Sequence, residues 1–132
     1  MSDPVSTRLD LPDPLIAVVG ATDEPGKYGG RIYRDLKAKG YRVVAVNLTR
    51  PTVDGDAAYK SVSDLPETPD IVNVVIPPPR TLELLDEIAE IPDIAVWIQP
   101  GAADDAVRDR VRVLGLPALI DACIMVQTRS KV

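Results

Sequence analysis

The fold is decided by the stretch LIAVVGATDEPGKYGG, residues 15–30. It begins with five apolar residues, 15–19, which end at Gly20 and lead into a loop rich in glycine. Apolar residues then recur every four positions from Tyr28 to Leu36, which predicts an amphipathic helix. A strand that is apolar on both faces and leads through such a loop into a helix is typical of an α/β protein with a buried parallel sheet.

The same alternation continues along the chain. Four further apolar runs are predicted to be strands: residues 42–47, 71–76, 94–99 and 116–120. Because crossovers between parallel strands are right-handed, we predict a Rossmann-like, doubly wound, five-stranded parallel sheet with the strand order 3-2-1-4-5. We predict a loop over residues 49–63, and a helix that begins within Pro77–Pro79, where proline is well tolerated.

The chain of 132 residues is long enough for one domain. We expect residues 15–126 to form a Rossmann-like binding domain. Residues 1–14 contain three prolines among charged residues and are predicted to be an extended lead-in. Residues 127–132 are predicted to be a polar tail.

Composition excludes several classes of function. The net charge is -5 and the basic residues are dispersed, which argues against nucleic-acid binding. No apolar run approaches the roughly 20 residues of a membrane span, and no secretory signal is visible, so we expect a cytoplasmic protein. The chain has no histidine, which excludes Ser-His-Asp and Cys-His catalytic groups. The single cysteine cannot form an internal disulfide, and no metal-ligating spacing is present, so we predict neither catalytic nor metal-binding residues.

Ligands of this fold bind at the carboxyl ends of the strands. After the first predicted strand, the glycine-rich loop can bring backbone N–H groups close to an anion at the start of a helix. Thr22 adds a hydroxyl and Lys27 a positive charge, so the loop is a candidate phosphate site. A flexible loop whose glycines serve turn geometry is the competing interpretation. The spacing matches neither G-x-G-x-x-G, because Thr22 stands at the second glycine position, nor a P-loop.

The second strand ends at Asn47, without the carboxylate that an NAD site uses to hold the ribose. Arg50 could instead meet a ribose phosphate, as in NADP or another phosphorylated adenosine, or it could be a solvated loop charge. Of the residues in the fourth strand, Trp97 is predicted to lie in the core, whereas Gln99 is a ligand candidate. Cys123 is interpreted as a small buried apolar residue.

Five motifs occur in an order that resembles the CoA-binding protein family, the small single-domain relatives of the CoA-binding domain of the succinyl-CoA synthetase alpha subunit. They are Ala17-Val18-Val19-Gly20-Ala21-Thr22, Gly40-Tyr41-Arg42-Val43 with Val46-Asn47, Gly55 and Tyr59 before Leu65-Pro66, Trp97-Ile98-Gln99 with Gly101, and Asp121 with Cys123-Ile124-Met125. The chain departs from the family at Leu48, where proline is usual, at Ala122, where arginine is common, and at Thr128, where the family commonly has histidine.

The resemblance implies that coenzyme A lies across the strand tips. It implies phosphate contacts at Gly20, Ala21 and Thr22 and around Lys27, Tyr28 and Gly29. It implies that the nucleotide lies near Val46, Asn47, Ile76 and Pro77, and that Ile98 and Gln99 lie along the cleft.

We therefore predict a module that binds coenzyme A or a short acyl-CoA without catalysis by this chain alone. An NADP-linked oxidoreductase and a nucleotide-sensing regulatory module are the alternatives. A protein partner is possible, and its identity is open.

Overall fold

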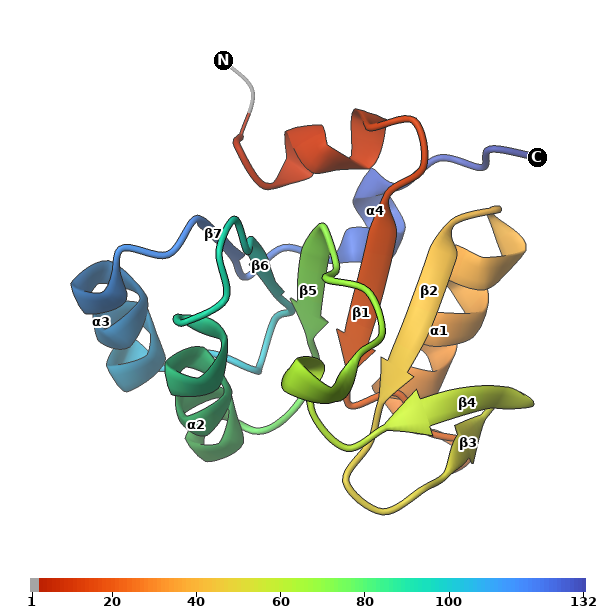
Figure 1. The fold of residues 1–132 in the computed structure, drawn as a ribbon, viewed down its shortest axis with the longest axis horizontal. Helices are drawn as coiled ribbons and strands as arrows, with labels where there is room; N and C mark the ends of the chain where they lie inside the picture. Colours follow the sequence, from red (N-terminus) through yellow and green to blue (C-terminus); the bar gives the residue numbers. More distant parts are fainter. Residues whose placement is uncertain (1–2) are drawn as a thin grey trace.

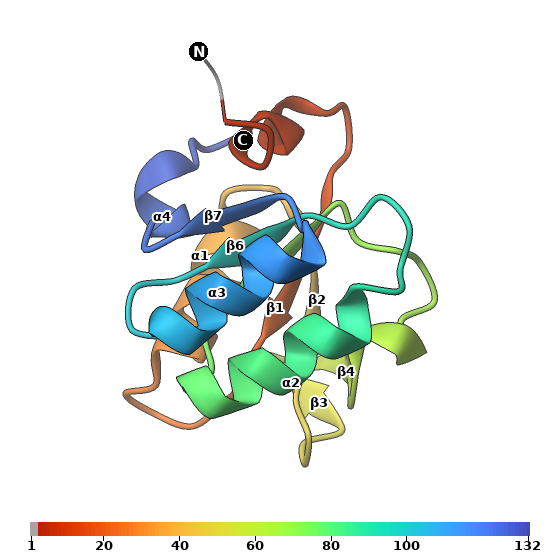
Figure 2. The ribbon, with the colours of Figure 1, turned by 90° about the vertical axis from the view of Figure 1, so that its left-hand side faces the viewer.

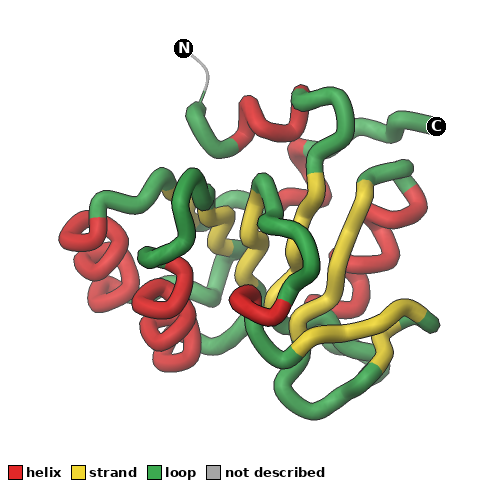
Figure 3. Tube along the Cα trace, in the orientation of Figure 1, coloured by secondary structure: helices red, strands yellow, loops and turns green. Residues whose placement is uncertain are grey.

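The computed structural model describes residues 3–132. Figures 1 and 3 show a central sheet with helices on both faces. The strands are β1 (Leu15–Val19), β2 (Arg42–Val46), β3 (Thr52–Val53), β4 (Asp56–Tyr59), β5 (Ile71–Val74), β6 (Val96–Ile98) and β7 (Ala118–Ile120). The helices are α1 (Tyr28–Ala38), α2 (Pro78–Ile88), α3 (Asp105–Leu114) and α4 (Ile124–Gln127), with 3-10 turns η1 (Ser6–Asp10) and η2 (Val62–Asp64).

The sheet has the order β3-β4-β2-β1-β5-β6-β7. All neighbouring strands run parallel except β3 and β4, which pair in antiparallel fashion. The predicted Rossmann-like α/β class is confirmed. All five predicted strands are present, the first with its predicted bounds and the other four in shorter form. The predicted five-strand order 3-2-1-4-5 is wrong, because the third predicted strand, β5, pairs directly with β1.

The error comes from the segment predicted to be a loop, residues 49–63. It contains the hairpin of β3 and β4, and β4 takes the place beside β2 that the prediction gave to the next long strand. The hairpin turns at Asp54 and Gly55, whose φ angles are 51° and 79°. An Asp-Gly pair with positive φ at both residues is a strong hairpin signal, but strands of two and four residues leave almost no hydrophobic pattern to read.

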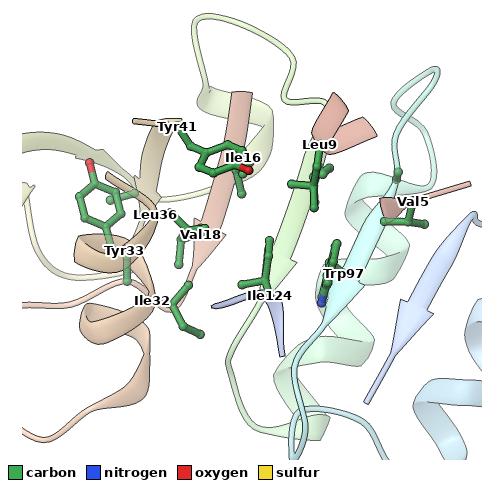
Figure 4. Packing of buried hydrophobic residues seen from close by; sticks show 14 of the residues in the cluster. Val5, Leu9, Ile16, Val18, Ile32, Tyr33, Leu36, Tyr41, Trp97 and Ile124 are labelled. Atoms are coloured by element: carbon green, nitrogen blue, oxygen red, sulfur yellow. The ribbon is translucent and has the colours of Figure 1, made fainter. Parts of the chain in front are cut away.

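Two apolar cores lie on the two faces of the sheet. Helices α2 and α3 cover one face, and Figure 2 looks onto them with the sheet behind. Helices α1 and α4 cover the other face, together with η1 (Figure 4). Trp97 is completely buried in this second core, and its Nε1 donates to the carbonyl of Ala122 at 2.9 Å. The interpretation of Trp97 as a core residue is therefore confirmed.

The segment before β1 is not extended as predicted. Residues Ser6–Asp10 form η1, and the side chains of Val5 and Leu9 are buried in the core that α1 and α4 share. Arg8 fastens the turn to the sheet, because its guanidinium donates to the carbonyl of Asp70 at 3.1 Å and pairs with Asp93 at 2.9 Å. The apolar residues between the prolines thus add to the core.

The two long helices that follow β5 and β6 have clear ends. Helix α2 begins with prolines at its first two positions, as predicted. Helix α3 begins after Asp104, whose carboxylate accepts from the N–H of Val107 at 2.9 Å, and it ends at Gly115 in the left-handed conformation. None of the helices within residues 3–132 has the length and apolar character that a membrane crossing requires.

Substitution of Leu9 by alanine tests whether η1 belongs to the folded core. Leu9 is 8% exposed, so Leu9→Ala should lower the free energy of unfolding by about 2–3 kcal/mol. Leu11→Ala is the matched control, because Leu11 is 41% exposed and its truncation should change the free energy by less than about 0.5 kcal/mol. Denaturant unfolding measures both, and equal effects of the two substitutions would contradict the packing of η1.

Candidate functional site

A cleft of about 650 Å³ opens at the carboxyl ends of β1, β2 and β5, which point downwards in Figure 1. Its walls are the loops that follow these strands, the first turns of α1 and α2, and the loop after β6. The lining residues are Gly20, Thr22, Glu24, Lys27, Tyr28, Gly29, Asn47, Leu48, Thr49, Val75, Ile76, Pro77, Pro78, Arg80, Pro100, Gly101 and Ala102. This is the edge at which ligands of open parallel sheets bind.

The loop after β1 packs directly against the first turn of α1. A Cβ at Gly29 would overlap the carbonyl oxygen of Gly20, and a Cβ at Gly30 would overlap that of Thr22. Gly20 has a φ of 106°, and a Cβ there would lie 2.7 Å from the carbonyl oxygen of Val75. On this side of the cleft, the backbone of the loop after β1 therefore contacts the backbone of α1 and of Val75 directly, and a side chain at Gly20 or Gly29 would not fit.

The first turn of α1 provides hydrogen-bond donors to the cleft. The first N–H groups of a helix have no acceptor within it, and they carry the positive end of the helix dipole. Lys27 precedes the helix without a side-chain cap, and the first turn holds no acidic residue. Helix α2 differs, because Pro78 and Pro79 have no N–H and the N–H of Arg80 donates to Pro77 at 3.0 Å. The donors for an anion therefore come from α1.

Two cations of the cleft have no carboxylate partner. Lys27 and Arg80 line the cleft, and neither forms an ion pair anywhere in the part of the chain that the structure describes. Outside the cleft, Arg42 pairs with Glu67 and Arg110 pairs with Asp86. Although the chain is acidic as a whole, the cleft keeps positive charges available for a negatively charged ligand.

Asn47 holds two loops of the cleft together. Its Nδ2 donates to the carbonyl of Ala21 at 2.9 Å, and its Oδ1 accepts from the N–H groups of Thr49 and Arg50, both at 2.9 Å. The amide thus joins the loop after β1 to the loop after β2. Both the donor and the acceptor atom of the Asn47 side chain are therefore hydrogen-bonded to the backbone of the site.

Cys123 lies next to the cleft on the side of α4. Its Sγ is 3.7 Å from the hydroxyl oxygen of Tyr28, a lining residue. Burial acts to raise the pKa of the Cys123 thiol, but hydrogen bonds from Tyr28 and from the backbone at Val126 and Met125 hold it below its ordinary value. The same contact with Cys123 raises the pKa of Tyr28. The phenol and the thiol therefore share one hydrogen bond, in which either group can be the donor.

A second hollow of about 130 Å³ adjoins the cleft between β2, η2 and α2. It shares Leu48, Ile76 and Arg80 with the cleft. Lys60 adds a positive charge, and Glu83 and Glu87 add negative ones. The two spaces together offer an apolar surface flanked by charged side chains.

Residues 15–129 match the profile of a family described as a CoA binding domain. The chain belongs to the CoA-binding domain family. The resemblance drawn from the sequence motifs is therefore confirmed.

Three relatives show how far the likeness extends. The CoA-binding domain is 37% identical over 76 residues to the acetate–CoA ligase [ADP-forming] II subunit alpha of Pyrococcus furiosus, a match that spans 57% of this chain and 17% of the ligase subunit. It is 30% identical over 114 residues to the uncharacterized protein YneT of Bacillus subtilis, covering 84% of this chain and 82% of that protein. A solved structure of a conserved hypothetical protein from Pyrococcus furiosus superimposes with a TM-score of 0.81 at 34% identity, covering 88% of this chain and 99% of the other.

Of the site residues predicted for the CoA-binding domain, most line the cleft: Gly20, Thr22, Lys27, Tyr28, Gly29, Asn47, Ile76 and Pro77. The others lie elsewhere. Ala21 and Ile98 are fully buried in the two cores, Val46 lines the second hollow, and Arg50 lies outside the lining. Gln99 is 1% exposed and faces α4, where its Oε1 accepts from the N–H of Ile124 at 3.0 Å.

Several lining residues were absent from the predicted site: Glu24, Leu48, Thr49, Val75, Pro78, Arg80, Pro100, Gly101 and Ala102. Arg80 had a visible signal, because it is a cation just after a predicted strand end. Leu48 had no such signal, because an exposed leucine in a loop belongs to no hydrophobic pattern that marks a binding site. Pro100 and Gly101 directly follow a predicted strand and were treated as its terminator.

Substitution of Gly29 by alanine tests the close contact in the CoA-binding domain. Alanine is favoured over glycine inside a helix, so an open site would gain about 1 kcal/mol. The overlap of the new Cβ with the carbonyl oxygen of Gly20 should turn this gain into a loss. We therefore expect Gly29→Ala to lower the free energy of unfolding by about 1–3 kcal/mol. Arg31→Ala, on the exposed face of the same helix, should stay within about 0.5 kcal/mol of wild type. Denaturant unfolding distinguishes the two, and a stabilised Gly29→Ala protein would show that the loop is open.

The pH dependence of thiol alkylation tests the contact between Cys123 and Tyr28. Because the thiolate is the reactive form, its lowered pKa should bring the midpoint of the rate of iodoacetamide alkylation below that of a free cysteine. Tyr28→Phe removes the donor and should move the midpoint upwards. Tyr59→Phe, in β4, should leave it unchanged, because Tyr59 is not among the groups that act on the thiol. Cys123 is the only cysteine of the chain, so the modified site is unambiguous.

Proposed function

We propose that this chain binds coenzyme A or a short acyl-CoA in the cleft, with the pyrophosphate at the start of α1, and does not catalyse a reaction alone. One observation carries the proposal. The first turn of α1 presents N–H groups that have no acceptor within the helix, beside a loop whose backbone packs directly against it. Lys27 and Arg80 line the same cleft, and neither has a carboxylate partner among residues 3–132. In a chain of net charge -5, such an arrangement favours a phosphorylated ligand.

The residues present fit this ligand. The cleft volume of about 650 Å³ is in the range of cofactor sites. The loop after β1 and the first turn of α1, which we call the cradle, would accept a pyrophosphate close to the backbone of Gly20 and Gly29, with Lys27 as a counter-charge. The apolar surface of Leu48, Ile76 and Pro77 would take the adenosine. Membership of the CoA-binding domain family supports the same ligand.

Arg80 is the strongest candidate for the additional phosphate on the ribose of coenzyme A. It lies at the junction of the cleft and the second hollow, without a carboxylate partner in the described part of the chain. Arg50, which the sequence suggested for this role, makes its recorded contact through its backbone N–H to Asn47. We therefore propose Arg80 in its place.

The bound group would supply a thiol or a thioester, and this chain would hold it. The cleft contains one carboxylate, Glu24, and the chain has no histidine. Because the ligase subunit among the relatives is far longer than this chain, we propose that chemistry on the bound group requires residues of another protein.

Calorimetric titration with coenzyme A tests the proposal. Wild type should bind, and Lys27→Ala should weaken binding about tenfold, because a hydrogen bond from a charged group contributes about 1–2 kcal/mol. Lys131→Ala is the matched control, since Lys131 lies over the ring of Tyr41, away from the cleft residues, and its loss should change the affinity by less than about twofold. The difference between the two variants should shrink at high salt.

NADPH titration in the same buffer distinguishes the alternative cofactor. We expect coenzyme A to bind more tightly than NADPH. The absence of both heat and thermal shift with millimolar coenzyme A would contradict the proposed function, and tighter binding of NADPH would favour the oxidoreductase.

A further inference from the structure

Cys123 occupies a place from which it can meet the reactive end of a ligand in the cleft. It follows the end of β7 by three positions, and β7 runs parallel to β6. The loop that carries Cys123 therefore leaves the sheet at the same edge as the cleft. The contact with Tyr28, at 3.7 Å, joins the thiol to the cleft wall, and Cys123 is partly exposed.

A second observation concerns the amide of Gln99. The side chain is 1% exposed, and its Nε2 has no hydrogen-bond acceptor within residues 3–132. The other atom of the same planar amide, Oε1, accepts from the N–H of Ile124, the residue next to Cys123. The amide of Gln99 is thus bonded to the turn that carries the thiol. A buried donor of this kind is costly unless an acceptor is supplied, and a ligand atom beside Cys123 would supply one.

The position of Gln99 in the chain links these groups to the cleft. Pro100 and Gly101, the two residues that follow it, line the cleft directly. Tyr28 and Gln99 therefore approach Cys123 from two different walls, one formed by α1 and the other by the loop after β6. The three side chains make a polar corner, which we call the thiol corner, at the edge of an otherwise apolar core.

We propose that Cys123 is a thiolation site, at which the chain forms a reversible mixed disulfide with the thiol end of the coenzyme held in the cleft. This proposal rests on the proposed function, because it assigns the thiol corner to the end of the same ligand. The thiolate of Cys123 attacks one sulfur of a CoA disulfide, and a new S–S bond forms between Cys123 and one coenzyme. The original S–S bond breaks, and the second coenzyme leaves as a thiolate that takes a proton from water. The CoA disulfide is the oxidant, so the step balances without a further reagent.

Tyr28 and Gln99 are positioning residues in this step. The hydroxyl of Tyr28 can donate to the sulfur once it is a thiolate, and this contact acts to lower the pKa of the thiol, so it favours the nucleophilic form. The Nε2 of Gln99 provides a second donor on the buried side. The nucleotide end, held by the cleft, raises the local concentration of the disulfide, so that coenzyme A should be selected over disulfides without a nucleotide.

Mass spectrometry of the intact full-length chain tests the proposal. Wild type is incubated with CoA disulfide and, separately, with glutathione disulfide at the same concentration, which reports the intrinsic reactivity of Cys123. We expect addition of one coenzyme at least ten times faster than addition of one glutathione. Acetyl-CoA, which has the nucleotide but no free thiol, should slow the first reaction and leave the second unchanged. Dithiothreitol should remove both groups. Equal rates for the two disulfides, or insensitivity to acetyl-CoA, would overturn the proposal.

Variants separate this proposal from the proposed function. Cys123→Ser should bind coenzyme A in the calorimeter and give no adduct, with Cys123→Ala as a replacement if the serine protein does not fold. Lys27→Ala should slow addition of coenzyme A about tenfold without changing the rate with glutathione. If coenzyme A binds but wild type forms no adduct, thiolation is wrong and the proposed function stands. If coenzyme A produces no heat and the two disulfides react equally, both proposals fail.

Discussion

The close contact between the loop after β1 and the first turn of α1 is the constraint on which the site depends. Gly29 and Gly30 let the helix begin against the carbonyl groups of Gly20 and Thr22, without room for a Cβ. This contact fixes the direction of α1 and leaves the N–H groups of its first turn facing the cleft. The loop also lies against Val75, the residue after β5, where a Cβ at Gly20 would approach the carbonyl oxygen. The positive character of the cleft follows from this packing together with two cations.

The remaining contacts of the site hold its loops rather than a ligand. Asn47 joins the loops after β1 and β2 through one amide. Thr128 stands where the family commonly has histidine, and it is buried: its hydroxyl donates to the carbonyl of Ile124 at 2.8 Å and contacts the Nζ of Lys39 at 3.0 Å. Lys39 also donates to the carbonyl of Met125 at 2.8 Å. Thr128 thus connects α4 to the end of α1. Its neutral hydroxyl makes these contacts without the imidazole that the family commonly has here.

The sequence predicts the elements of this fold better than their arrangement. Runs such as residues 15–19 and 71–76 are unmistakable, because strands buried on both faces are almost continuously apolar; Asn73 is the one polar residue in these two runs. The short strand β4 contains Ala57 and Ala58 and has little apolar surface to mark it, so its place beside β2 was given to β5. The glycine loop was identified from its position between a strand and a helix. Ile98 and Gln99 were predicted to lie along the cleft. Ile98 instead packs in the core beneath α2 and α3, and Gln99, which follows β6, faces α4. Pro100 and Gly101, the next two residues, line the cleft.

The hydrogen bond between the indole of Trp97 and the carbonyl of Ala122 gives this protein an internal optical reporter. Trp97 is the only tryptophan, it is screened from water, and its bonded carbonyl belongs to the residue just before Cys123. Indole emission responds to changes in a nearby hydrogen-bonded dipole. Events at the thiol corner should therefore register as a change in fluorescence, without any added label.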